Sequence, residues 1–91
     1  MAKISRDSAE VMAANALGFL AEDEDRFGDF LALTGLSPDD VRSQVNDPTF
    51  LAGVMQYMVE NERLLVEFAS SADLIAEAVA EAAQALGVHW E

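Results

Sequence analysis

Apolar residues recur along this chain every three or four positions, and apolar and polar residues never alternate over a sustained stretch. Because an α-helix turns once in about 3.6 residues whereas a strand alternates from residue to residue, this spacing predicts helices and argues against strands. About six short helices are expected, so the predicted fold class is all-α.

Helix starts and stops are marked by residues that suit those positions. Ser37 followed by Pro38 is the clearest start, because serine caps a helix and proline fits its first position. Gly35 and Gly87 are expected to end the second and the last helix. The expected caps in chain order are Ser5, Asp7 or Ser8, then Asp23, Ser37, Asp47 and Asn61, and finally Ser71 or Asp73.

The apolar stripes of these helices outline a core. Phe30 and Phe68 are expected to be among the most buried residues, and the stripe of the last helix is expected to include Ile75 and Val79. Tyr57 lies about 100° away from the stripe residue Met58 on a helical wheel, so an exposed aromatic is predicted there.

The two halves of the chain resemble each other when one is shifted by 38 positions along the other. The shift places Phe30 on Phe68 and the segment 22–24 on 60–62. Identities are few, so the interpretations are a compact pair of similar three-helix halves or two helical triplets that share only their period. In either case residues 1–91 are predicted to form a single helical domain, with 1–5 and 88–91 flexible.

The charge of the chain narrows its possible partners. Seventeen acidic residues against five basic ones give a net charge of -12, which excludes a general binder of nucleic acid or of anionic lipid. The chain has no cysteine, which excludes disulfides and thiolate-bound zinc. No apolar run approaches the ~20 residues of a membrane span and no targeting segment is visible, so a cytoplasmic location without membrane contact is expected.

The arginines are expected to form ion pairs with carboxylates one helical turn away. The expected pairs are Arg26 with Glu22 and Asp29, Arg42 with Asp39, and Arg63 with Glu60 and Glu67.

The sequence contains no motif for a metal site or for a catalytic site. An EF-hand alignment that starts at Asp23 puts Phe27 in the fifth position, where calcium needs an oxygen ligand, and Thr34 in the twelfth, where it needs a bidentate glutamate. His89 is the only histidine, and no carboxylate stands at a spacing that would pair with it. Motifs for a nucleophile or for phosphate binding do not occur. We therefore expect no cofactor, no metal and no catalytic activity.

The segment FLALTGL at 30–36, with Arg42 after Pro38, is the most distinctive stretch of the chain. Together with the segments 16–21, 50–52 and 68–69 it resembles a family of short alphaproteobacterial proteins catalogued as a domain of unknown function, number thirty-five seventy-two. The chain departs from the family pattern at Glu24 and at 72–74, where prolines would be expected. The resemblance covers almost the whole chain and implies an all-helical fold, but no activity.

The favoured function is a small acidic module for protein–protein interaction, since catalytic, metal and basic features are missing. A negative ridge at the starts of the second and third helices would speed encounter with a basic protein, although it could equally be a solvated face that serves solubility. The alternatives are an acidic mimic of nucleic acid that occupies a DNA-binding protein, and a small enzyme with a shallow site. The candidate partner-binding residues are Glu22, Asp23, Glu24, Asp25, Asp29, Asp39 and Asp40.

Overall fold

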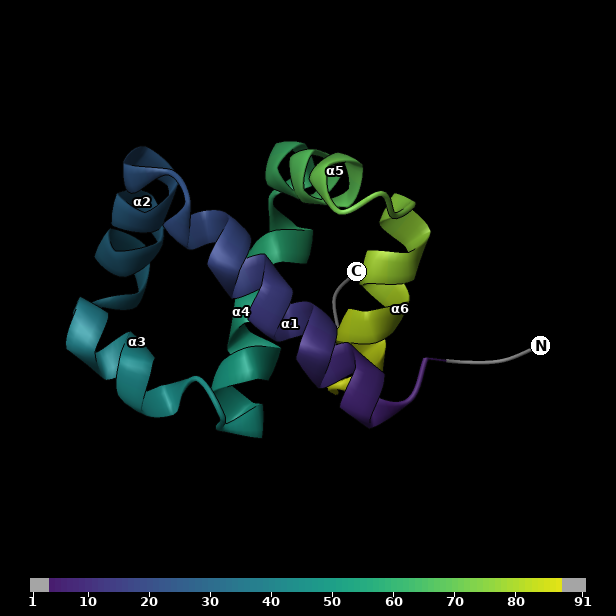
Figure 1. The fold of residues 1–91 in the computed structure, drawn as a ribbon, viewed down its shortest axis with the longest axis horizontal. Coiled ribbons are helices and arrows are strands. Elements are labelled where there is room, and N and C mark those ends of the chain that lie inside the picture. The colour runs from purple at the N-terminus through teal and green to yellow at the C-terminus, as the bar shows by residue number, and fades with distance from the viewer. Residues whose placement is uncertain (1–3, 88–91) are drawn as a thin grey trace.

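The computed structural model describes residues 4–87, and in that range it contains helices and no strands, which confirms the all-α prediction (Figure 1). The predictions for residues 1–3 and 88–91, including that for His89, lie outside the described residues. None of the described helices is both long and apolar enough to cross a membrane. The helices are α1 (Arg6–Ala21), α2 (Glu24–Thr34), α3 (Pro38–Gln44), α4 (Pro48–Glu60), α5 (Glu62–Ser71) and α6 (Ala76–Ala85).

Side-chain caps fix the starts of the first five helices. At α2 the Asp23 carboxylate accepts hydrogen bonds from the backbone N–H groups of Asp25 at 2.9 Å and Arg26 at 3.3 Å. At α3, Ser37 and Asp40 each accept the other's backbone N–H, a capping box that holds the pKa of Asp40 below its ordinary value through the bond from the Ser37 backbone first. The caps of α1, α4 and α5 are Ser5, Asp47 and Asn61, as predicted.

The predicted start of the last helix is wrong. Neither Ser71 nor Asp73 caps α6, which begins at Ala76 after an N-cap residue, Ile75, that offers no side-chain bond. Asp73 instead adopts the left-handed conformation with φ of 58°, and the Leu74 N–H donates to the carbonyl of Ala69 at 2.7 Å. Together with the bond that the Asp73 N–H donates to the Ser70 carbonyl at 3.3 Å, this bond forms a Schellman motif that ends α5. The turn also leaves the Ile75 side chain 67% exposed, so the prediction that it joins the core is wrong as well.

We expect Asp73→Gly to stabilise the protein. A left-handed backbone costs residues other than glycine about 1–2 kcal/mol, and aspartate escapes only part of this cost. After the greater flexibility of glycine in the unfolded chain is subtracted, urea denaturation should show a gain of about 0.5–1 kcal/mol. Asp73→Val should be destabilising. A glycine variant less stable than the parent would show that the Asp73 side chain itself holds the turn.

The core lies where α1 crosses α4, with α5 and α6 packed on the same side of the molecule and α2 near the end of α1 (Figure 1). Phe30 and Phe68 are 1% and 2% exposed, which confirms their prediction as core residues. Buried alanines lie on both α1 and α6, where they let the two helix backbones come close. The largest fully buried side chains are Phe30, Phe68, Leu20, Met55, Met58, Val54 and Val79.

The two halves of the chain share one helix pattern. Helices α2 and α5 start at residues 24 and 62, and α3 and α6 start at 38 and 76, so both pairs follow the 38-residue shift. Aromatic contacts between the halves are reciprocal: Phe19 packs on Phe68 at 5.4 Å between ring centroids, and its counterpart Tyr57 packs on Phe30 at 5.1 Å. Tyr57 is therefore half-buried against the core, not the exposed aromatic that was predicted.

The third helix of each half differs in its packing. Helix α6 packs against α1, α4 and α5, whereas α3 makes few contacts with any other helix. The shift indicates one cause of this difference, because Ala82, which is fully buried on α6, corresponds to Gln44 of α3, which is only half-buried. The longer amide side chain of glutamine cannot be buried in a close helix–helix contact as the methyl group of alanine can. Helix α3 consequently stands away from α1.

Candidate functional site

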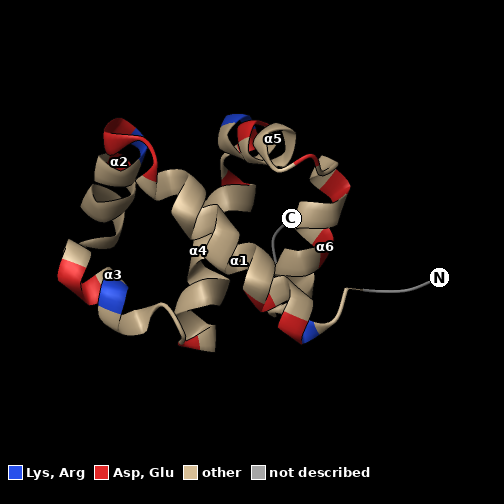
Figure 2. Ribbon diagram, viewed as in Figure 1, with Lys and Arg blue, Asp and Glu red and all other residues tan. Residues whose placement is uncertain are grey.

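The structure divides the seven predicted acids into two groups. Glu22, Asp23, Glu24, Asp25 and Asp29 lie at and beyond the start of α2. Asp39 and Asp40 begin α3, which follows the other end of α2 (Figure 2). The 11 residues of α2 span about 16 Å, so the two groups do not form one continuous ridge.

Three of the acids line a cleft of about 460 Å³ between the starts of α2 and α5. Its two walls correspond residue by residue under the 38-residue shift, since each half contributes the beginning of its second helix. We call this hollow the acidic cleft. It is lined by Asp23, Asp25, Arg26 and Asp29 from the α2 side and by Asn61, Arg63, Leu64 and Glu67 from the α5 side.

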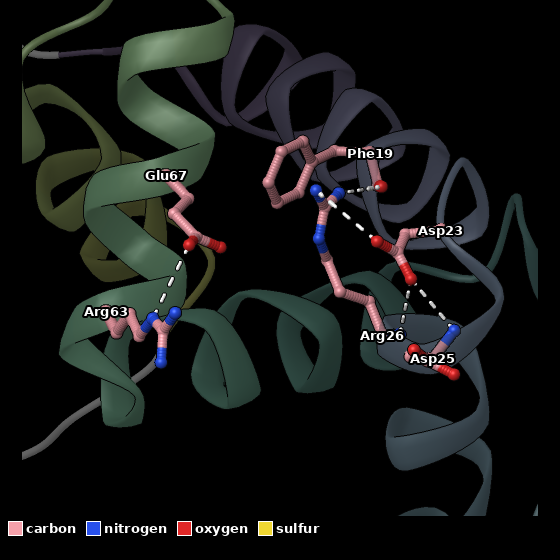
Figure 3. A network of polar contacts seen from close by, with 6 residues as sticks. All are labelled: Phe19, Asp23, Asp25, Arg26, Arg63 and Glu67. Carbon is pink, nitrogen blue, oxygen red and sulfur yellow. Dashed lines mark hydrogen bonds and ion pairs between the residues drawn. The ribbon is translucent and has the colours of Figure 1, made fainter.

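Arg26 joins α2 to the end of α1. Its guanidinium donates a hydrogen bond to the Phe19 carbonyl at 2.9 Å and lies 4.1 Å from the centre of the Phe19 ring (Figure 3). A cation at this place offsets the negative end of the α1 dipole and stacks on an aromatic face. Its ion-pair partner is Asp23 at 3.9 Å, not Glu22 or Asp29 as predicted, because the carbonyl and the ring fix where the guanidinium lies.

The opposite wall holds a second, more exposed arginine. Arg63 pairs with Glu67 at 3.5 Å, as predicted, while the predicted contact with Glu60 is absent from the ion pairs of residues 4–87. The Arg63 side chain is 89% exposed, so this pair contributes little to stability. The predicted pair of Arg42 with Asp39 also forms, outside the cleft.

Two carboxylates of the cleft remain uncompensated. Within residues 4–87, no ion pair joins Asp25 or Asp29 to a cation. The cleft thus holds four carboxylates against two guanidinium groups, both of which already have partners. No cluster of three or more potential metal ligands occurs in the described part of the chain. The arrangement suits the attraction of a cationic side chain.

A comparison with models of known protein families identifies the family of this chain. A family model described as a protein of unknown function, DUF3572, matches residues 6–89. The chain belongs to the DUF3572 family. This confirms the resemblance seen at FLALTGL, and the matched range contains every residue that lines the acidic cleft. No curated protein and no solved structure matches the chain.

The pKa of Tyr57 depends on burial and on the negative charge of the acidic cleft in this DUF3572 protein. Its pKa is raised above the ordinary value, chiefly because burial disfavours the charged phenolate and further because the charge of Asp29 repels it. The neutral phenol therefore contributes stability that is complete below about pH 10 and is lost as the pH rises through the folded-state pKa.

We expect Asp29→Asn to lower the pKa of Tyr57 toward its ordinary value without reaching it, because burial remains. Tyr57 is the only tyrosine, so phenolate absorbance in a pH titration measures this group alone. Asp7→Asn, on the first turn of α1, is the control and should leave the pKa unchanged. An unchanged pKa in Asp29→Asn would contradict the assigned repulsion.

The DUF3572 fold also contains an apolar groove that was not predicted from the sequence. We call it the α1–α3 groove; it has a volume of about 410 Å³ and continues past Ala14 into a second hollow of about 360 Å³. The apolar floor of the groove could have been predicted from the sequence of α1, because α1 has apolar residues on more than one face and only one of these faces was predicted to join the core. The first hollow is lined by Ala14, Leu17, Gly18, Ala21, Phe27, Pro38, Val41 and Arg42, and the second by Asp7, Glu10, Val11, Ala14, Val45, Asn46 and Leu51.

Proposed function

We propose that this DUF3572 protein is a non-catalytic protein-binding module that meets a basic partner at the acidic cleft. The observation that carries this proposal is the pair of exposed carboxylates, Asp25 and Asp29, which have no ion-pair partner within residues 4–87. Glu67 faces them from α5. An open hollow with excess negative charge raises the local concentration of a cationic side chain and speeds its encounter.

The chemistry of the lining favours binding over catalysis. Apart from Leu64, the side chains that line the acidic cleft are carboxylates, guanidinium groups and one amide. General acid–base or nucleophilic catalysis usually needs an imidazole, a thiol, an activated hydroxyl or a carboxyl group of perturbed pKa. The net charge of -12 directs the choice of partner toward a basic protein and away from nucleic acid.

A pair of double variants tests this proposal in an affinity capture from lysate. Asp25→Lys with Asp29→Lys reverses the charge in the acidic cleft, and Glu77→Lys with Glu81→Lys makes the same change of net charge on α6. These are exposed positions, so each variant should keep its fold with a stability change of less than ~1 kcal/mol per substitution. Circular dichroism and thermal melting check this.

The cleft variant is expected to lose a partner that both the parent and the α6 variant retain. Equal loss by both double variants would show that the whole negative surface is recognised, as in a mimic of nucleic acid, and would contradict binding at the cleft. Unchanged capture by the cleft variant would contradict it too.

A further inference from the structure

The α1–α3 groove is a second surface, distinct from the acidic cleft. Its floor is the face of α1 that the core leaves uncovered, where Val11, Ala14, Gly18 and Ala21 follow one another at intervals of three or four residues. Because residues so spaced share one side of a helix, they form a continuous strip. Val11 is 62% exposed on this strip. Helix α3 supplies the opposite wall with Pro38, Val41 and Arg42, and Val45 continues it.

The groove exists because α3 does not pack as α6 does. Helix α6 packs buried alanines against α1 on a face of α1 other than the groove floor, whereas α3 makes few contacts with the other helices. The space between α1 and α3 is therefore left open to solvent, with Phe27 of α2 and Leu51 of α4 adding to its apolar lining. Grooves of this kind take an amphipathic helix, which buries residues at positions i, i+3, i+4 and i+7.

Gly18 lies on the floor of the groove. A glycine inside a helix costs roughly 1 kcal/mol relative to alanine. Nothing lies within 4 Å of the Cβ that alanine would add at this position, so the packing of the fold does not require glycine. The absence of a side chain on the groove floor does, however, leave room for the backbone of a bound helix.

The ends of the groove carry opposite charges. Asp7 and Glu10 line the second hollow near the start of α1, where Glu10 also pairs with Arg6 at 3.6 Å, and Arg42 lines the first hollow, which reaches the end of α1 at Ala21. Arg42 pairs with Asp39, but their side chains are 75% and 90% exposed, so the pair is weak enough to exchange for another partner. Residues 7–21 of α1 extend about 21 Å, which equals about four helical turns.

We propose that the α1–α3 groove binds an amphipathic helix of a partner protein. The helix has an apolar stripe of about four turns, a basic side chain at the end that meets Asp7 and Glu10, and an acidic side chain at the end that meets Arg42. This surface goes beyond the function proposed for the acidic cleft and does not depend on it.

Four synthetic helical peptides of 14 residues provide the probe. They share one leucine stripe and differ only in their end residues. The first has Lys at its N-terminal end and Glu at its C-terminal end, the second has the reverse, the third has Lys at both ends and the fourth has Glu at both ends. Fluorescence anisotropy measures their affinity for the full chain. We expect a peptide with opposite end charges to bind tightest, and which of the two it is gives the direction of the helix. Arg42→Glu should move the preference to the peptide with two Lys by about fivefold, as expected for exposed charge pairs.

Two leucine substitutions separate the groove from the rest of the surface. Gly18→Leu fills the floor of the groove, and Gly28→Leu adds the same side chain to a helical glycine of α2 outside the groove lining. Both sites have open space around the new Cβ, so both variants should fold. Gly18→Leu should weaken peptide binding by at least about tenfold, which corresponds to 1.4 kcal/mol, while Gly28→Leu should bind as the parent does.

Three results would overturn the helix-binding proposal. The first is equal affinity in the two leucine variants, and the second is no binding by any of the peptides. The third is self-association of the parent, measured by sedimentation, that Gly18→Leu abolishes, since the occupant would then be a second copy of the chain. The variant Asp25→Lys with Asp29→Lys should bind the peptides as the parent does, so failure at the groove and failure at the acidic cleft are distinguishable.

Discussion

Replacement of Phe68 by alanine is expected to lower the free energy of unfolding by about 3–5 kcal/mol. The ring is 2% exposed and packs on Phe19 at 5.4 Å between centroids, so its removal leaves a cavity between the two halves of the chain. Because a small domain has a total stability of about 5–15 kcal/mol, this loss would be a large part of it. Urea denaturation of the parent and the variant measures the difference.

Phe30→Ala should have an effect of the same size, since Phe30 holds the corresponding place in the other half and packs on Tyr57. Leu33→Ala provides the control on the same helix, because Leu33 is 73% exposed and its truncation should change the stability by less than about 0.5 kcal/mol. If Phe30→Ala and Leu33→Ala unfold at the same urea concentration, the assignment of the core is wrong.

Enlargement of a buried alanine on α1 is the second large effect. Ala13 is fully buried on a helix that packs against both α4 and α6. Ala13→Leu forces three additional carbon atoms into a closely packed region, which should cost about 1–3 kcal/mol.

The adjacent Ala14 gives a matched control. It faces the α1–α3 groove and is exposed, so Ala14→Leu should change the stability by no more than about 0.5 kcal/mol. Thermal melting of the two variants tests whether the Ala13 face of α1 is buried and the Ala14 face is exposed. Equal melting temperatures would contradict this.

The helices could be predicted because their starts depend on neighbouring residues. Asp23, Ser37, Asp47 and Asn61 each cap a helix through a bond to a backbone N–H two or three residues ahead. Such bonds need no information from the rest of the fold. The start of α6 was missed because aspartate suits two backbone conformations, a helix cap and a left-handed turn, and Asp73 adopts the second.

The candidate sites depend on tertiary packing and were only partly predictable. The sequence indicated that the acidic residues at the start of α2 and along it would be exposed. All of them are exposed except Asp23, which is half-buried. Their meeting with Glu67 across a cleft required the relative positions of α2 and α5. The α1–α3 groove likewise depends on how far α3 stands from α1, a distance that helical periodicity does not specify.

Binding of a basic protein at the acidic cleft is tested most directly by the rate at which a captured partner associates with the parent at low and at physiological salt. Exposed charges are screened beyond about 8 Å at physiological ionic strength, so the association rate should fall as salt is added, with little change in the dissociation rate. The variant Asp25→Lys with Asp29→Lys should associate slowly even at low salt. An association rate that neither salt nor this double variant alters would contradict recognition through the acidic cleft.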